Sequence, residues 1–280
     1  QRQMCIRDRL DCANGSASAT AQALFEKLGA TVHMLSDQPN GLNINDHCGS
    51  THMEQLMQYV KTHDCDAGLA FDGDADRMLA VDECGEVVDG DQLMSICGNY
   101  MKQKGTLKKN TIVATVMSNL GMFLMGEREG IHIEKTKVGD RYVLENMLEN
   151  GYNIGGEQSG HIIFLDENTT GDGLLSALHL LQVMTETKKK LSELASIMEV
   201  LPQALVNAKV PNHKKEHFEE YAEIAEAIAE VEAKFAGEGR VLIRPSGTEP
   251  LVRVMIEGKD QQLIESEAQK LAELISSIML

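Results

Sequence analysis

The sequence predicts an α/β protein made of two consecutive three-layer α/β domains, followed by a small α+β C-terminal domain. Short apolar runs, such as residues 67–71 and 111–116, have the length of buried strands and alternate with segments of helical periodicity. A cluster of aspartates directly follows the first of these runs. Beyond Pro202 the order of elements changes to β-α-β-β-α, which is typical of a small α+β domain.

Composition and charge narrow the class of protein. The 280 residues suffice for two or three domains, and 42% hydrophobic with 25% charged residues is typical of a globular protein. A net charge of −17 argues against nucleic acid or an anionic membrane as a partner. The six cysteines are scattered without a C-x-x-C pair, which favours a reducing compartment. The sequence shows no membrane span and no signal peptide, so we expect a cytoplasmic location.

The first predicted domain covers residues 10–90. Strands at 31–35 and 67–71 alternate with helices at 16–28 and 51–62, which implies a parallel sheet. Residues 1–9 carry three arginines and no strand alternation, so we predict that they are a non-native leader. The opening strand would then be truncated at Leu10, which would leave an unpaired edge.

The second and third predicted domains cover residues 91–200 and 203–280. The second combines strands and helices, with strands at 111–116, 131–133 and 161–165 and helices at 91–104, 120–129, 140–150, 173–187 and 191–198. The third has strands at 204–210, 240–244 and 251–257, a long acidic helix at 213–235 and a final amphipathic helix at 261–278. This order predicts a second α/β unit and then a three-stranded sheet covered by two helices.

The loop after strand 67–71 is the strongest candidate for a functional site. Asp72, Asp74 and Asp76 alternate with small residues there. Three close carboxylates repel one another, and a bound divalent cation relieves that repulsion. Oxygen ligands suit Mg²⁺, which is commonly held by carboxylates together with a substrate phosphate. Two alternatives stay open: a simple acidic turn, and a calcium loop, which Arg77 disfavours because it stands where an EF-hand needs glycine.

A second candidate is the turn of residues 244–250, with Arg253 beyond it. Its sequence is Arg-Pro-Ser-Gly-Thr-Glu-Pro. The Ser-Gly-Thr segment offers hydroxyl and backbone N–H groups to an oxyanion, and Arg244 and Arg253 can bond a phosphate bidentately. From spacing alone, an ordinary hairpin turn with two solvated arginines explains the pattern equally well.

Two weaker candidates lie in the second domain. A glycine-rich run holds Glu157 and Ser159, which can bond hydroxyl groups, although a plain turn is the more common meaning of such a run. Lys137 and Arg141 can face an anion, while Asp140 between them is equally suited to cap a helix. The sequence shows no Ser/His/Asp or Cys/His set, and its nine histidines lack metal-ligand spacing.

Taken together, the motifs resemble those of the α-D-phosphohexomutase superfamily. Four segments carry the resemblance in the family's order, namely residues 72–77, 138–143, 156–161 and 244–250, with support from 43–51 and 169–173. The glutamine in Gly-Glu-Gln-Ser-Gly and the run Asp-Arg-Tyr-Val favour the glucosamine branch over the phosphomannomutase and phosphoglucomutase branches.

The resemblance implies four family domains, of which this chain is similar to the second, third and fourth. The implied reaction interconverts glucosamine 6-phosphate and glucosamine 1-phosphate through a sugar 1,6-bisphosphate, for cell-wall precursor synthesis. The family's phosphoserine loop has no counterpart in these residues, and Ser118 does not replace it. We therefore expect the 280 residues alone to be inactive. The resemblance is compatible with a homodimer, and the alternatives are a phosphomannomutase or phosphoglucomutase, or a non-catalytic fragment that binds a phosphosugar and Mg²⁺.

The resemblance also implies roles for individual residues. Asp72, Asp74 and Asp76 would hold Mg²⁺, and Arg77 and Lys137 would be catalytic. The phosphorylated hexosamine would be bound by Gly139, Asp140, Arg141, Glu157, Ser159, His161, Arg244, Ser246, Gly247, Thr248 and Arg253.

Overall fold

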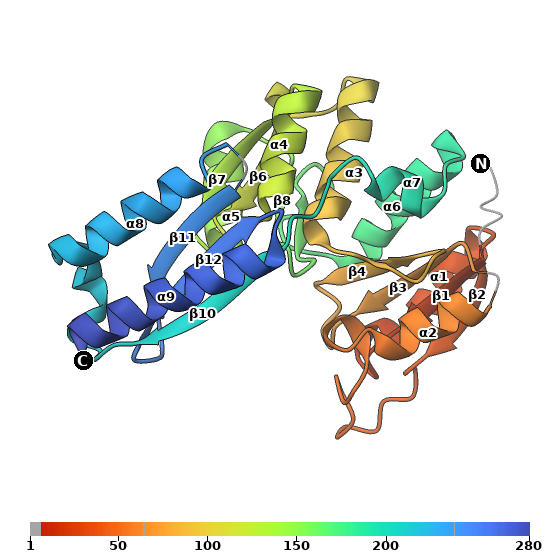
Figure 1. The fold of residues 1–280 in the computed structure, drawn as a ribbon. Helices are drawn as coiled ribbons and strands as arrows, with labels where there is room; N and C mark the ends of the chain where they lie inside the picture. The colour runs from red at the N-terminus through yellow and green to blue at the C-terminus, as the bar shows by residue number, and fades with distance from the viewer. Residues whose placement is uncertain (1–6, 64, 238) are drawn as a thin grey trace. The chain divides into compact units, whose positions relative to one another are not determined.

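The computed structural model of the chain describes residues 7–63, 65–237 and 239–280 (Figure 1). By its internal contacts the chain divides into two compact units. Of the described residues, the first unit holds 7–118 and 122–199, and the second holds 119–121 and 200–280. None of the described helices has the length and apolar character needed to cross a membrane.

The first sheet of unit 1 has five strands in the order β2-β1-β3-β4-β5. Its strands are β1 (Arg7–Asp11), β2 (Thr31–Leu35), β3 (Ala67–Phe71), β4 (Met78–Asp82) and β5 (Val87–Val88). β1 is parallel to both neighbours, but β3 and β4 form an antiparallel hairpin in which Phe71 pairs with Met78. The predicted parallel arrangement is confirmed for β1, β2 and β3. The chain then adds β4 in the antiparallel direction, because the six residues between β3 and β4 are too few for a crossover.

β1 also corrects the predictions about the start of the chain, although residues 1–6 lie outside the described part. The strand begins at Arg7 and lies inside the sheet, with Leu10 between Met34 and Leu69, so it leaves no unpaired edge. Asp8 is fully buried there, and neither of its carboxylate oxygens has a hydrogen-bond partner. Burial, with a smaller contribution from Asp66, raises the pKa of Asp8 to about 7. A buried carboxyl group without hydrogen-bond partners is unfavourable at this place.

Helices pack on this sheet through apolar faces. They are η1 (Ser16–Ala19), α1 (Ala21–Lys27), η2 (Gly49–Thr51) and α2 (Glu54–Thr62). Leu56 and Val60 of α2 pack with Ala70 and Val81 in the core. The helix predicted at 16–28 is present as α1, and the segment before it is the 3-10 helix η1.

The second sheet of unit 1 has four strands in the order β7-β6-β8-β9. Its strands are β6 (Thr111–Thr115), β7 (His132–Thr136), β8 (Ile154–Gly156) and β9 (Ile162–Phe164). β6 is parallel to β7 and β8, and β9 is antiparallel to β8. The helical segments of this region are α3 (Gly90–Lys104), η3 (Lys108–Asn110), α4 (Leu120–Glu129), α5 (Asp140–Asn150), α6 (Gly173–Thr187) and α7 (Leu191–Ala195).

Unit 2 is a three-stranded antiparallel sheet with two long helices against it (Figure 1). The sheet order is β10-β12-β11, with β10 at Gln203–Lys209, β11 at Gly239–Pro245 and β12 at Leu251–Gly258. The helical segments are η4 (Lys215–Glu220), α8 (Ala222–Lys234) and α9 (Gln261–Met279). The α+β prediction is confirmed, but the single helix predicted at 213–235 is wrong. Tyr221 has an extended backbone and separates η4 from α8.

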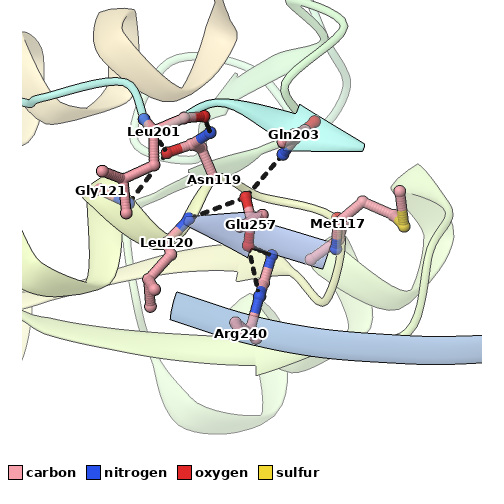
Figure 2. A network of polar contacts seen from close by, with 9 residues as sticks. Met117, Asn119, Leu120, Gly121, Leu201, Gln203, Arg240 and Glu257 are labelled. Carbon is pink, nitrogen blue, oxygen red and sulfur yellow. Dashed lines mark hydrogen bonds and ion pairs between the residues drawn. The ribbon is translucent and has the colours of Figure 1, made fainter. Parts of the chain in front are cut away.

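A buried polar network surrounds Glu257 of β12 in unit 2, and the side chain of Glu257 is fully enclosed (Figure 2). Arg240 forms an ion pair with Glu257, and Gln203 donates to its Oε1 at 2.6 Å. The same oxygen accepts the Leu120 N–H at 3.1 Å. The carboxylate is thus compensated by one cation and by neutral donors, as a buried charge requires.

Candidate functional site

The aspartate loop, residues 72–77, is a tight turn between β3 and β4. Ala75 has a φ of 60°, and its N–H donates to the Asp72 carbonyl at 3.1 Å. A Cβ on Gly73 would lie 2.7 Å from Ile44 and 2.8 Å from Asn45, so only glycine fits there. The turn leaves its three aspartate side chains on one side of the loop.

These three carboxylates form a donor set that suits a divalent cation. Asp72, Asp74 and Asp76 each offer one oxygen, and these oxygens lie within 4.8 Å of one another. Burial, followed by the charges of Asp76 and Asp74, raises the pKa of Asp72 to about 6. The Oδ1 of Asp76 is buried without a hydrogen-bond partner. A cation would relieve both the repulsion and the unsatisfied oxygen, so the residues present fit Mg²⁺.

Arg77 partly offsets the negative charge of the loop. Its Nε lies 3.8 Å from Asp72 Oδ2 and 3.7 Å from Asp76 Oδ1, while its backbone N–H donates to Asp72 Oδ1 at 3.2 Å. Its side chain is 44% exposed. The guanidinium can therefore hold the carboxylates and still reach a ligand that approaches from solvent.

His161 joins the glycine-rich loop to the aspartate loop. Its backbone forms a β-bridge with Arg77, and the Met78 N–H donates to the Gly160 carbonyl at 3.1 Å. The buried ring accepts the Gly171 N–H at Nε2, 3.2 Å away, and the same nitrogen lies 3.7 Å from Asp76 Oδ2. An accepting Nε2 requires the neutral tautomer with the proton on Nδ1. The spacing of histidines in the sequence contained no signal for this contact.

Glu157 connects the glycine-rich loop to the segment that precedes α5. Its Oε1 accepts the Gly139 N–H at 3.0 Å, and its own N–H donates to the His161 carbonyl. Ser159 is exposed at the tip of the loop. Gly139 has a φ of 128°, which favours glycine, and it occupies the N-cap position of α5. Asp140 is the first helical residue, so its alternative role as the N-cap is wrong by one position.

Lys137 and Arg141 are exposed on either side of this cap. Arg141 pairs with Glu145 at 2.7 Å, and Glu145 raises the pKa of that guanidinium. The Lys137 ammonium lies 6.0 Å from the ring of Tyr142. In the described part of the chain no contact brings either cation to the aspartates.

The phosphate turn, residues 244–250 with Arg253, lies in unit 2 between β11 and β12. Arg244 and Arg253 are directly opposite in the antiparallel register. Burial, and then the charge of Arg253, lowers the pKa of Arg244. The buried Ser246 accepts the Glu249 N–H at 3.2 Å, and Gly247 is exposed beside Thr248 at the tip. The sheet therefore gathers two guanidinium groups beside a turn that is rich in donors.

Lys215 is the residue near this turn that sequence reasoning missed. It belongs to η4 and is almost fully buried, and its ammonium donates to the carbonyls of Ser246 and Glu249. The sequence predicted one continuous helix over residues 213–235. That prediction contained no sign of the break at Tyr221 or of the separate segment η4 that holds Lys215.

Comparison with known proteins gives consistent matches along the chain. Domain descriptions of the phosphoglucomutase/phosphomannomutase family match residues 7–85 as alpha/beta/alpha domain II, 89–201 as alpha/beta/alpha domain III and 205–274 as the C-terminal domain. The phosphoglucosamine mutase of Clostridium acetobutylicum is 60% identical over 266 residues, which cover 95% of this chain and 59% of that protein. The phosphoglucosamine mutase of Ruminiclostridium cellulolyticum is 60% identical over 271 residues, which cover 96% and 60%. The chain thus spans about 60% of the length of these relatives.

Solved structures show the same fold at low sequence identity. The Aspergillus fumigatus N-acetylphosphoglucosamine mutase, in complex with GlcNAc-6P and magnesium, has a TM-score of 0.79 at 19% identity, over 98% of this chain and 67% of that chain. A phosphoglucomutase/phosphomannomutase family protein from Burkholderia thailandensis has a TM-score of 0.78 at 20% identity, over 96% and 60%. These matches agree with the predicted fold class.

Proposed function

Since this chain belongs to the phosphoglucomutase/phosphomannomutase family, we propose that it forms the metal-, sugar- and phosphate-binding part of a phosphoglucosamine mutase. Such an enzyme interconverts glucosamine 6-phosphate and glucosamine 1-phosphate through a sugar 1,6-bisphosphate. The observation that carries the proposal is the 60% identity to phosphoglucosamine mutases along nearly the whole chain. The arrangement of the aspartate and glycine-rich loops supports it.

The aspartate loop is proposed to hold Mg²⁺ through Asp72, Asp74 and Asp76. The clustered oxygens and the unsatisfied Asp76 Oδ1 support this assignment. When bound, the ion would supply charge neutralisation at the oxygens of the transferred phosphoryl group. The ring of His161 lies beside Asp76, and Arg77 is proposed as the catalytic cation that can reach a phosphate from the solvent side.

The glycine-rich loop is proposed to bind the sugar. In the described contacts Glu157 uses one carboxylate oxygen for Gly139, which leaves the other to accept a sugar hydroxyl. The exposed Ser159 hydroxyl can donate to the sugar or accept from it. The proposed catalytic role of Lys137 and the proposed substrate-binding roles of Asp140 and Arg141 are kept. These residues flank Gly139, whose N–H donates to Glu157.

The phosphate turn is proposed to bind the phosphate that does not react. The Ser246 hydroxyl already accepts the Glu249 N–H, so its own proton is available to an anion. Arg244 and Arg253 add charge-assisted bonds, and Gly247 and Thr248 add backbone N–H groups at an exposed tip. The sugar 1,6-bisphosphate must present its two phosphates one after the other. The phosphate turn is therefore proposed to contact only the phosphate that does not react, and not the sugar.

A chimera tests the proposed function. The 280 residues are joined to the part of the Clostridium acetobutylicum phosphoglucosamine mutase that they do not match, and turnover is measured with Mg²⁺ and a catalytic amount of glucosamine 1,6-bisphosphate. We expect turnover of glucosamine 6-phosphate by the chimera and none by the 280 residues alone. Preference for mannose or glucose phosphates would assign the chain to another branch. A folded chimera that binds the sugar phosphate without turning it over would support a binding role only.

A further inference from the structure

Lys215 lies directly beneath the phosphate turn. Its side chain is 8% exposed, and its ammonium donates to the Ser246 carbonyl and, at 3.3 Å, to the Glu249 carbonyl. These two carbonyls bracket Gly247 and Thr248. One side chain from η4 therefore fixes both ends of the tip that would meet an anion.

The charge of Lys215 has no carboxylate to balance it. Among the residues that the structure describes, no Asp or Glu forms an ion pair with this ammonium. The carboxylate of Glu249, which belongs to the same turn, pairs with Arg253 at 3.1 Å instead. A buried cation that is compensated only by carbonyl dipoles is unfavourable, so it favours the approach of an anion.

Two further cations lie on the strands that flank the turn. Arg244 and Arg253 occupy opposite positions of β11 and β12, and burial, followed by the charge of Arg253, lowers the pKa of Arg244. Glu249 is the only carboxylate within the turn sequence, and it neutralises one of the three cations. Two of the three positive charges at the turn therefore remain uncompensated, and they match the two negative charges of a dianion.

We propose that Lys215 is a positioning residue of the phosphate turn whose charge makes the turn prefer a dianionic phosphate ester over a monoanionic ester. This inference rests on the proposed function, because it deepens the role of the same turn. The side chain acts through the Ser246 and Glu249 carbonyls and through its field, without contact to the ligand.

Two esters of the same sugar separate charge from shape. At pH 8 glucosamine 6-phosphate carries two negative charges on its ester, because the second phosphate pKa is about 6. Glucosamine 6-sulfate has the same shape and one negative charge. Isothermal titration of the 280-residue chain with each ester measures the two affinities.

Three variants provide the comparison. Lys215→Gln keeps N–H donors for the turn and loses the charge, Lys215→Met loses both, and Lys259→Gln removes an exposed charge elsewhere in unit 2. We expect Lys215→Gln to weaken the phosphate ester by about tenfold or more, and the sulfate ester by much less. Lys215→Met should weaken both esters, and Lys259→Gln neither. If Lys215→Met fails to fold, Lys215→Gln decides the question.

The outcomes separate this inference from the proposed function. Equal weakening of both esters by Lys215→Gln would show that the residue is structural only. Unchanged affinities in that variant, with weakening by Arg244→Ala, would overturn the role of Lys215 and leave the phosphate turn in place. If the unaltered chain binds neither ester, the proposed phosphate turn and the inference built on it are both wrong.

Discussion

The aspartate loop and the phosphate turn are proposed to bind ions of opposite charge, and they are assembled in different ways. All three carboxylates of the loop, and the Arg77 that offsets them, come from six consecutive residues. The cations of the turn come from β11, β12 and η4, and the sheet register and the fold of η4 bring them together. A contiguous motif can therefore be recognised in a sequence, whereas a dispersed one is recognised only in part.

The sheets beneath the two regions differ as well. Each contains a fully buried carboxylate, Asp8 in β1 and Glu257 in β12. Glu257 is bound by Arg240, Gln203 and the Leu120 N–H, whereas Asp8 has no hydrogen-bond partner and its pKa is raised. The same functional group is thus compensated in one sheet and uncompensated in the other, depending on its partners.

The largest effect is expected from breaking the compensated pair. Arg240→Ala should destabilise unit 2 by about 3–5 kcal/mol, because it leaves Glu257 buried without its cation. Urea denaturation followed by circular dichroism measures the change. As a control, Arg141→Ala removes the ion pair with Glu145, in which the Arg141 side chain is 80% exposed. This variant should lower the free energy of unfolding by at most about 1 kcal/mol. Equal effects of the two variants would remove the distinction between the buried and exposed pairs.

A smaller effect with a clear pH dependence is expected at Asp8. Between about pH 4 and pH 7 the unfolded chain loses the Asp8 proton while the folded chain keeps it, so the stability of the unaltered chain falls with rising pH. Asp8→Asn removes this dependence. Its stabilising effect should grow by about 2.5 kcal/mol from pH 5 to pH 7.5, measured by urea denaturation at both pH values. A pH-independent effect would mean that Asp8 is hydrated or paired in solution.

The phosphate turn itself is tested by Arg244→Ala. Loss of a charge-assisted bond worth about 1.5–3 kcal/mol should weaken glucosamine 6-phosphate binding by roughly 10- to 150-fold. Calorimetric titration should show unchanged Mg²⁺ affinity in the same variant, and Lys259→Ala serves as the matched surface control. Unchanged sugar phosphate affinity would reduce the motif to an ordinary hairpin turn.

The aspartate loop is tested by Asp74→Asn. Removal of one anionic ligand should weaken Mg²⁺ binding at least about tenfold, or 1.4 kcal/mol. Glu230→Gln, which removes an exposed carboxylate of α8, controls for net charge. Binding of glucosamine 6-sulfate without Mg²⁺ should be the same in both variants. Equal Mg²⁺ affinity in all three proteins would exclude Asp74 as a ligand.

The sequence alone predicted the features that arise from neighbouring residues. The aspartate triad, the Ser-Gly-Thr tip and the three-strand, two-helix composition of unit 2 follow from local spacing and periodicity. The helix end at Gly151, with a φ of 69°, also agrees with the sequence, because a glycine after a helical run favours that conformation. Such features need no knowledge of distant partners.

Tertiary structure decided the features that depend on distant partners. The pairing of β3 with β4, the contact of His161 with Asp76 and the position of Lys215 beneath Ser246 join residues whose separation along the chain has no fixed period. The inclusion of residues 7–9 in β1 was missed because backbone pairing on both sides outweighs the unfavourable side chain of Asp8. Hydrogen bonds and burial of this kind are properties of the folded chain, and local residue preference is too weak to predict them.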